Sequence, residues 1–241
     1  MTTPEIVRHA DASALYDAAA ADVSQLVQAA IAERGICHIA LAGGRTPRGL
    51  YEVLATDPHI AWDKVIVLFG DERAVPPDDP ASNFGMAREA LFDRLPIPPT
   101  VLRMSGELPA ADAARAYDAV VRVAEPLDVV LLGMGDDGHV ASFFPGTPEP
   151  DADARVIATT SPLPPPSRVS LTLAAIRRSR AILLLVTGAG KAARLAEVWR
   201  QIADGAPRLP AARATSESGI CRWHVDTAAA AQLPSASEEL A

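Results

Sequence analysis

A glycine-rich segment, residues 133–142, carries the residues of this sequence that are best suited to chemistry. It reads GMGDDGHVAS and follows an apolar run that is typical of a buried strand. His139 in such a turn is in an unusual place for a core histidine, and an imidazole titrates near neutral pH, where it can take a proton from water. Asp137, two residues earlier, could orient the ring or a substrate hydroxyl. The segment therefore predicts acid–base catalysis by His139 with Asp137 beside it.

Two other interpretations of this segment are a purely structural turn and a metal site. Its potential metal ligands are Asp136, Asp137 and His139, and no second histidine accompanies them. We therefore expect neither a metal nor another cofactor. Ser142 as a covalent nucleophile is a further alternative, but the sequence around it lacks the GxSxG turn that exposes such a serine.

Residues 42–47, AGGRTP, predict a phosphate site. Gly43 and Gly44 follow an apolar run and would let the backbone approach a ligand closely. The helix that begins near Pro47 would direct free N–H groups and a partial positive charge at an anion. Arg45 and Thr46 could add hydrogen-bond donors, although a tight turn without a ligand would have the same sequence. The segment is neither GxGxxG nor a Walker loop, so it does not predict dinucleotide or ATP binding.

Further charged residues follow other apolar runs. Asp71, Glu72 and Arg73 come directly after one of them. Arg73 could bind a phosphate with two hydrogen bonds, and Asp71 or Glu72 could hold a sugar hydroxyl or orient a base. Lys191, at a helix start after a glycine-rich turn, suits a phosphate as a point charge, and Arg168 is a further candidate. The alternative for each is a solvated turn with internal ion pairs.

The elements that must position these residues alternate between helix and strand. Helical spacing of apolar residues predicts a helix over residues 11–33, which Gly35 ends. Apolar runs predict strands that lead into glycine-rich turns, at residues 36–41, 64–69, 127–132 and 181–187. Continuous apolar strands separated by helices indicate a parallel sheet that is covered on both faces. Because ligands bind at the carboxyl ends of such strands, the four turns should converge on one cleft.

The remaining pattern completes an α/β fold, a Rossmann-like, mostly parallel sheet with helices on both faces. Further helices are expected over residues 83–94, 109–125 and 191–202, with a short one from Asp226, and further strands at residues 156–160, 168–173 and 221–225. Proline-rich stretches at residues 76–80 and 162–166 are candidate rim loops. Since we find no repeat and no long linker, residues 1–241 are predicted to form a single domain.

Composition narrows the class of protein. The chain has 241 residues and a net charge of −8, and an acidic surface argues against nucleic acid or an anionic membrane as a partner. Cys37 and Cys221 lie in or beside apolar runs without metal-ligand spacing, which predicts two buried free thiols in a reducing compartment. The N-terminal residues lack the apolar core of a signal peptide, and no apolar run is long enough to span a membrane. We expect a cytoplasmic protein that acts as a monomer.

The motifs, taken in order, resemble those of the 6-phosphogluconolactonases. The resemblance covers nearly the whole chain, and so many motifs in one order are far more specific than any one of them. It rests on Gly43, Gly44, Thr46, Pro47, Asp71, Glu72, Arg73, Asn83, Gly133, Gly135, Asp137, Gly138, His139, Ala141, Ser142, Phe144, Pro145, Gly146, Arg168, Leu171, Thr172, Gly188, Lys191, Trp223 and Asp226.

The resemblance implies a Rossmann-like fold, similar to that of glucosamine-6-phosphate deaminases, ribose-5-phosphate isomerases and coenzyme A transferases. It implies hydrolysis of 6-phospho-D-glucono-1,5-lactone to 6-phospho-D-gluconate, the second step of the oxidative pentose phosphate pathway. The partner would be this small sugar-phosphate lactone. His139 would be the catalytic residue, and Arg73, Arg168 and Lys191 would lie around the phosphate.

Two related functions are alternatives. Glucosamine-6-phosphate deaminases share the Asp-Gly-His core, and Arg45 resembles the deaminase form of a loop that often reads SGGSTP in the lactonases, so the contacts of Arg45 stay open. Deaminases, however, carry a catalytic glutamate where this chain has Phe144 and a tyrosine in place of Arg73. A sugar-phosphate sensor of the same fold would usually carry a DNA-binding segment, for which a fold that starts by Asp11 leaves no residues. An intact His139 also favours turnover over binding alone.

Overall fold

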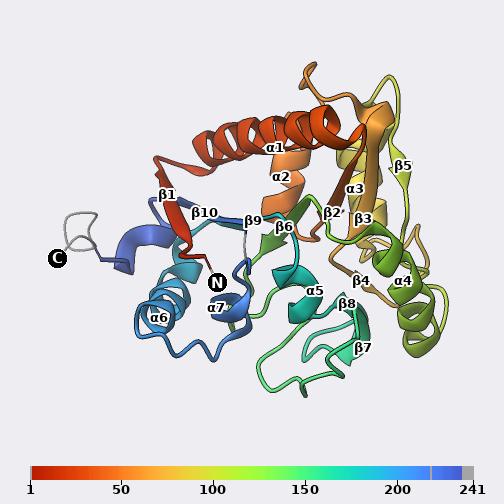
Figure 1. The fold of residues 1–241 in the computed structure, drawn as a ribbon. Helices are drawn as coiled ribbons and strands as arrows, with labels where there is room; N and C mark the ends of the chain where they lie inside the picture. The colour runs from red at the N-terminus through yellow and green to blue at the C-terminus, as the bar shows by residue number, and fades with distance from the viewer. Residues whose placement is uncertain (1, 218, 235–241) are drawn as a thin grey trace.

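A seven-stranded sheet forms the centre of the protein (Figure 1). The computed structural model describes residues 2–217 and 219–234. Every pair of neighbouring strands in this sheet is parallel. In spatial order the strands are β1 (Glu5–His9), β10 (Ile220–Asp226), β9 (Ala181–Val186), β6 (Val129–Gly133), β2 (Cys37–Leu41), β3 (Val65–Phe69) and β5 (Thr100–Val101).

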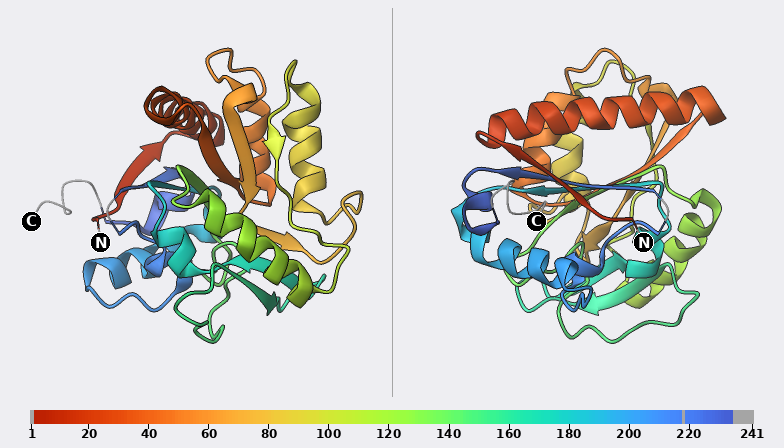
Figure 2. Two further views of the ribbon diagram at one scale, coloured as in Figure 1. Left: turned by 45° about the vertical axis from the view of Figure 1, so that its right-hand side comes forward. Right: turned by 60° about the vertical axis from the view of Figure 1, so that its left-hand side comes forward.

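Helices cover both faces of this sheet, as the sequence predicts for a Rossmann-like fold. Figure 2 shows α1 (Ala12–Arg34) on one side and α6 (Ala192–Ala203) on the other. The other helices are α2 (Arg45–Leu54), α3 (Asn83–Ala90), α4 (Ala110–Ala124), α5 (Leu173–Arg177) and α7 (Pro210–Arg213). Short 3-10 helices are η1 (Trp62–Lys64), η2 (Phe92–Arg94), η3 (Ala189–Lys191) and η4 (Ala229–Gln232).

Local sequence explains where the elements begin and end. All six residues of β9 are buried, which is why the strand reads as one apolar run instead of alternating. Asp11 caps α1 by accepting the backbone N–H of Ala14 at 2.9 Å. Gly35 ends the same helix in a left-handed conformation with φ of 79°, and its N–H donates to Ile31 O at 2.8 Å. The predicted helix and its stop are therefore confirmed.

A second, antiparallel sheet packs beside the first, and the sequence did not predict it as a separate layer. It contains β4 (Asp71–Arg73), β8 (Ser167–Leu171) and β7 (Val156–Thr160), in that order. The predicted strands at residues 156–160 and 168–173 exist, but they leave the main sheet. The expected turn at residues 70–73 is instead a strand, because its backbone pairs with β8.

Three further differences from prediction have local causes. The fold begins at β1, before Asp11; this edge strand mixes exposed and half-buried side chains and so gives no apolar run. β5 has only two residues, too few for a pattern. The helix expected over residues 83–94 breaks at Leu91, whose φ of −128° leaves helical geometry, and resumes as the 3-10 turn η2.

Buried apolar side chains from both sheets join in one continuous cluster, which includes Trp223 of β10 and Val169 of β8. Cys37 and Cys221 are free and buried, as predicted. Burial raises the pKa of Cys37 to about 12 and that of Cys221 to about 11. Both thiols are therefore protonated and unreactive near neutral pH.

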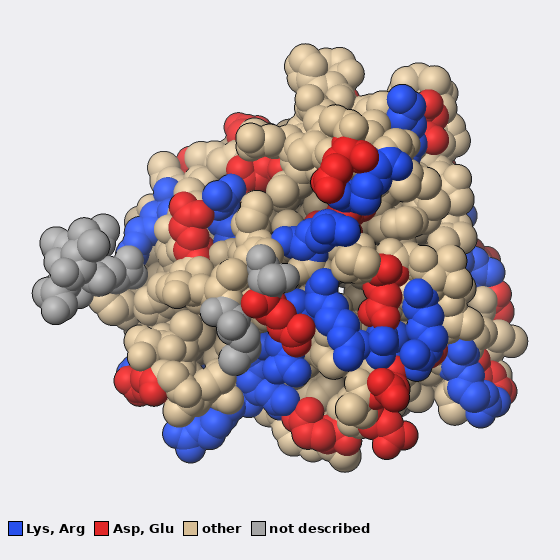
Figure 3. Space-filling model, in the orientation of Figure 1, with Lys and Arg blue, Asp and Glu red and all other residues tan. Residues whose placement is uncertain are grey.

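On the surface, basic and acidic side chains are interspersed over the face shown in Figure 3. Exposed ion pairs such as Arg115–Asp112 also occur on the surface. Pairs of this kind add little to stability because water screens them.

Tyr51 links the core to the turn after β2. Its side chain is fully buried, and its hydroxyl donates to Ala42 O at 2.7 Å and accepts Ala42 N–H at 2.8 Å. Both backbone groups of Ala42 therefore find their partner in one phenol. Since Ala42 immediately precedes Gly43 and Gly44, this contact fixes where the glycine turn starts.

We expect Tyr51→Phe to lower the free energy of unfolding by about 1–3 kcal/mol, because it leaves buried N–H and C=O groups of Ala42 without a partner. Denaturant unfolding followed by tryptophan fluorescence measures this. Tyr16→Phe is the matched control, since the Tyr16 hydroxyl has no hydrogen-bond partner among the described residues. Equal stability of Tyr51→Phe and the wild type would show that the phenol does not support the turn.

Candidate active site

The four glycine-rich turns lie together at one edge of the large sheet. They follow β9, β6, β2 and β3, which are consecutive in the strand order and parallel, so their carboxyl ends meet as predicted (Figure 1). The hydroxyls of Thr46 and Thr187 are 2.7 Å apart and join two of the turns. Gly70 N–H donates to Leu41 O at 2.8 Å and joins another two strands.

His139 and Asp137 form a hydrogen-bonded pair in the turn after β6. The imidazole Nδ1 lies 2.6 Å from Asp137 Oδ1, and the same oxygen accepts the backbone N–H of His139 at 3.1 Å. An ionised carboxylate can only accept, so Nδ1 donates to Asp137, and in a neutral ring Nε2 is then the nitrogen with the lone pair. The described residues offer no partner to Nε2, and the His139 side chain is 30% exposed. This arrangement suits a general base whose tautomer is fixed by its neighbour.

Glycine is required where the imidazole lies on the turn. A Cβ on Gly135 would come within 2.1 Å of His139 Nδ1 and 2.8 Å of Asp137 Oδ1. Gly135 N–H donates to His139 O at 2.9 Å, which closes the turn. Gly138 has a φ of +85°, a conformation that glycine adopts without steric cost.

The backbone after His139 is held in an unusual conformation. Ala141 has a φ of 49°, a left-handed value that residues other than Gly, Asn and Asp seldom adopt. The next residue, Ser142, is buried; its N–H donates to Ser170 Oγ at 3.1 Å and its hydroxyl donates to Asp71 Oδ2 at 2.5 Å. These bonds to the second sheet keep the strained turn in place. They also engage the Ser142 hydroxyl, which does not fit a free nucleophile.

Two contacts support the His139 turn from the side of α6 and α7. Arg194 Nε donates to Asp136 O at 3.1 Å, and Ala211 N–H donates to Gly138 O at 2.9 Å. The turn is therefore fixed at both ends of the Asp136–Gly138 segment.

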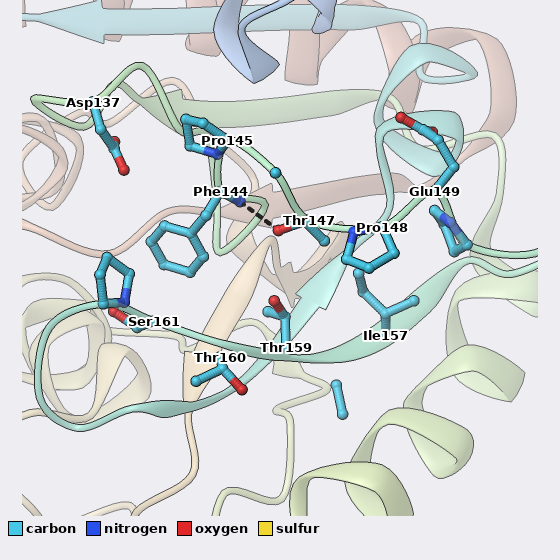
Figure 4. Close-up of a pocket in the computed structure, with 14 residues that line it drawn as sticks. Asp137, Phe144, Pro145, Thr147, Pro148, Glu149, Ile157, Thr159, Thr160 and Ser161 are labelled. Atoms are coloured by element: carbon cyan, nitrogen blue, oxygen red, sulfur yellow. Dashed lines mark hydrogen bonds between the residues drawn. The ribbon is translucent and has the colours of Figure 1, made fainter.

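Phe144 packs on the imidazole, with ring centroids 4.6 Å apart and an angle of 53° between the ring planes. The same ring lines a groove of about 720 Å³. Asp137 lies at one end of the groove and Glu149 at the other, while Thr159 and Ser161 form the opposite wall (Figure 4). A ligand in this groove would therefore reach the His139–Asp137 pair.

Arg73 and Arg168 are brought together in the second sheet, where they face each other in the register of β4 and β8. Arg168 is buried. Its burial, and then the charge of Arg73, lowers the pKa of its guanidinium. The Nε atoms of both residues are buried without a hydrogen-bond partner among the described residues. Two like charges with unused donors favour an anion between or beside them.

Arg168 also connects this pair to the groove. One of its Nη atoms lies 3.4 Å from Ser161 Oγ and 3.4 Å from Leu163 O. Ser161 lines the groove, and Leu163 belongs to the proline-rich stretch that we expected at the rim.

Lys191 and Arg45 form a second basic group, around the carboxylate of Asp136. Lys191 Nζ lies 2.5 Å from Asp136 Oδ1. The pKa of Asp136 is lowered first by its hydrogen bond to Lys191 and further by the charges of His139 and Arg45. Gly44, which precedes α2, has a φ of 103°, and the first turn of α2 supplies N–H groups for an anion.

Asp71 and Glu72 point into the protein. Asp71 is buried and accepts from the side chains of Ser142 and Asn83. Glu72 accepts the backbone N–H groups of Asn83 and Phe84, at the start of α3. Burial raises the pKa of Glu72, and these N–H groups oppose that rise. Both carboxylates therefore hold protein elements together, and neither faces the groove.

The supporting roles of two residues are visible only in the structure. Asp226, at the end of β10, accepts Gly188 N–H at 3.0 Å and so fixes the turn that carries Lys191. Asn83 packs so closely on Gly43 that a Cβ there would lie 1.9 Å from Asn83 Oδ1. The only signal in the sequence was their place among the family motifs, because each acts on a residue far away along the chain.

Comparison with known proteins now places this α/β protein and its histidine–aspartate site. A model of the family described as glucosamine-6-phosphate isomerases/6-phosphogluconolactonase matches residues 10–223. The chain belongs to this family. It is 37% identical over 252 residues to a 6-phosphogluconolactonase of Streptomyces coelicolor, covering 96% of this chain and 95% of that protein. It is 38% identical over 244 residues to the 6-phosphogluconolactonase of Mycobacterium tuberculosis, covering 93% and 96%.

Solved structures agree with this placement. The 6-phosphogluconolactonase of Trypanosoma brucei superposes with a TM-score of 0.84 at 30% identity, over 97% of this chain and all of that one (100%). The Thermotoga maritima protein gives 0.81 at 32% identity, over 92% and 99%. A monomeric glucosamine-6-phosphate deaminase gives 0.81 at 22% identity, over 95% and 99%, which shows a shared fold alone.

None of the helices in residues 2–217 and 219–234 combines the length and apolar character needed to cross a membrane. In the same part of the chain, no three His, Cys, Asp or Glu side chains cluster as metal ligands would.

Gly135→Ala should displace the imidazole of His139 while the protein stays folded, because the added methyl overlaps Nδ1. In a protein labelled with ¹⁵N-histidine, the ring signals of His139 should shift and those of the other histidines should not. Gly133→Ala, two residues earlier at the end of β6, is the matched control, since a Cβ there meets nothing within 4 Å. Unchanged His139 signals in Gly135→Ala would contradict the close packing.

Proposed function

We propose that this protein hydrolyses 6-phospho-D-glucono-1,5-lactone to 6-phospho-D-gluconate, the second step of the oxidative pentose phosphate pathway. The observation that carries the proposal is the His139–Asp137 pair with Nε2 free, next to groups of basic side chains. The similarity to proteins named 6-phosphogluconolactonase, over nearly the full length of the chain, supports it.

In this proposal the basic groups hold the phosphate end of the substrate. The residues are Gly43, Gly44, Arg45, Thr46, Arg73, Arg168 and Lys191. The hydroxyl of Thr46 is also hydrogen-bonded to that of Thr187. The binding energy of the basic groups places the ester carbonyl near His139, so that a water molecule activated by the imidazole is already close to the carbon that it attacks. Asp71, whose partners are Ser142 and Asn83, takes part by positioning the His139 turn.

The chemical step needs one base and one acid, and His139 supplies both in turn. Nε2 takes a proton from a water molecule as the water oxygen attacks the carbonyl carbon. Asp137 holds the Nδ1 proton and stabilises the imidazolium that forms. When the tetrahedral intermediate collapses, the bond from carbon to the ring oxygen breaks and His139 gives its proton to that oxygen. The products are the open carboxylic acid and its hydroxyl, with the imidazole neutral again.

The alternative deaminase function lacks support at one position. Phe144 lies on the imidazole, and a phenyl ring cannot act where deaminases carry a glutamate. The proposal also includes a monomer that works in the cytoplasm, and the free buried cysteines fit a reducing compartment.

His139→Ala should reduce kcat by about 10²–10⁴-fold, the usual contribution of a general base, and leave binding of 6-phosphogluconate intact. The assay generates the lactone from glucose 6-phosphate and follows its product with the NADP-linked dehydrogenase. His59→Ala, at an exposed histidine, is the matched control. A wild-type kcat in His139→Ala would exclude the general-base role, and ammonia release from glucosamine 6-phosphate by the wild type would favour the deaminase.

Lys191→Ala and Arg73→Ala should each raise KM for the phosphorylated lactone by about tenfold or more, because each removes a charged hydrogen bond. The measurement compares this substrate with unphosphorylated glucono-1,5-lactone. Neither variant should change kcat/KM for the unphosphorylated lactone by more than about twofold. A variant that leaves KM for the phosphorylated lactone unchanged would remove its residue from the phosphate site.

A further inference from the structure

In the free protein, the carboxylate of Asp136 already pairs with Lys191, one of the proposed phosphate-binding residues. Asp136 Oδ1 lies 2.5 Å from Lys191 Nζ, and the Asp136 side chain is 86% exposed while that of Lys191 is 25% exposed. Asp136 also interacts with the charges of His139 and Arg45. Its carboxylate therefore occupies the region where three positively charged or ionisable groups meet, which is where an anionic ligand would be most stable.

The backbone on both sides of this ion pair is fixed, so only side chains need to move. Asp136 O accepts from Arg194 Nε at 3.1 Å, and the next residue, Asp137, is held by His139. Across the pair, Asp226 holds Gly188 at the start of the turn that carries Lys191. The exposed Asp136 carboxylate can rotate into solvent while Lys191 stays in the site.

We propose that Asp136 is a positioning residue that competes with the phosphate of the ligand for Lys191. In the free protein it holds Lys191 in place. It releases Lys191 to an incoming phosphate and takes it back when the phosphorylated product leaves. The inference rests on the proposed function in one respect, that Lys191 binds the phosphate of substrate and product.

The physical argument is a comparison of two partners for one ammonium group. An exposed ion pair is weak because water screens it and two side chains must be ordered. A phosphate carries more charge than a carboxylate and can contact Arg45 and the N-terminus of α2 at the same time. Phosphate therefore displaces Asp136 from Lys191, but its affinity is lower than it would be if Lys191 had no partner in the free protein. Substrate and product are both bound less tightly, which favours release of a product that keeps its phosphate.

Asp136→Asn tests this, since it removes the charge and keeps the shape. We expect KM for the phosphorylated lactone, and Kd for inorganic phosphate and 6-phosphogluconate by calorimetry, to fall about two- to fivefold, the range that an exposed ion pair implies. Asp136→Glu should stay near the wild type. Asp112→Asn is the matched control, because it too removes one carboxylate from an exposed pair, with Arg115. A purely structural role for Asp136 would instead lower stability and kcat without tightening phosphate binding.

The effect must also pass through Lys191. In a Lys191→Ala background, Asp136→Asn should change Kd for phosphate by less than about twofold, because only the weaker interaction with Arg45 and His139 remains. A persistent two- to fivefold gain would overturn the proposal. So would an unchanged Kd in the single variant. The two proposals fail separately. If the wild type does not hydrolyse the lactone but Asp136→Asn binds phosphate more tightly, the lactonase function is excluded and this inference stands. If the wild type hydrolyses the lactone but Asp136→Asn leaves KM and Kd unchanged, the lactonase function stands and this inference is excluded.

Discussion

The hydrogen bond from Ser142 Oγ to Asp71 Oδ2, 2.5 Å long, joins the His139 turn to the second sheet. Asp71 is buried, and a buried carboxylate is stable only if its oxygens are hydrogen-bonded, which Ser142 and Asn83 achieve. The chain leaves the large sheet at Phe69 and enters the small one at Asp71. The carboxylate thus lies where the two sheets meet. Because it anchors Ser142, it also stabilises the left-handed Ala141, and through that residue the position of His139.

The charges of the site are arranged for a ligand instead of for the free protein. Arg73 and Arg168 face each other with unused donors, and such repulsion costs free energy that a bound anion would recover. At the second basic group, the carboxylate of Asp136 pairs with Lys191 and so offsets the positive charge in the free protein. One basic group therefore keeps unused donors, and the other is neutralised by a carboxylate of the protein. Under the proposed function, a phosphate would find unused donors at the first group and would have to displace a carboxylate at the second, so the first group would contribute more to affinity than the second.

The sequence predicted the large sheet and its ligand edge because both depend on local patterns. A run such as the one that forms β9 is apolar throughout, and glycines mark where each strand ends. The small sheet was missed because β4 has only three residues, all charged; its pairing with β8 depends on a partner far along the chain. The inward direction of Asp71 and Glu72 was hidden for the same reason. The order of residues in the sequence places a carboxylate near the site, but packing decides whether that carboxylate faces the ligand or the protein interior.

The fold alone does not decide the reaction. A deaminase structure with 22% identity superposes about as well, at a TM-score of 0.81, as the lactonase of Thermotoga maritima does, so function has to be argued from side chains. Phe144 is the most informative of them. Its ring lies 4.6 Å from that of His139 and lines the groove, so the side chain that packs on the imidazole is a hydrocarbon that cannot exchange a proton. What remains next to the ring is one imidazole with one oriented carboxylate, the pair that the proposed hydrolysis would use to activate water against an ester.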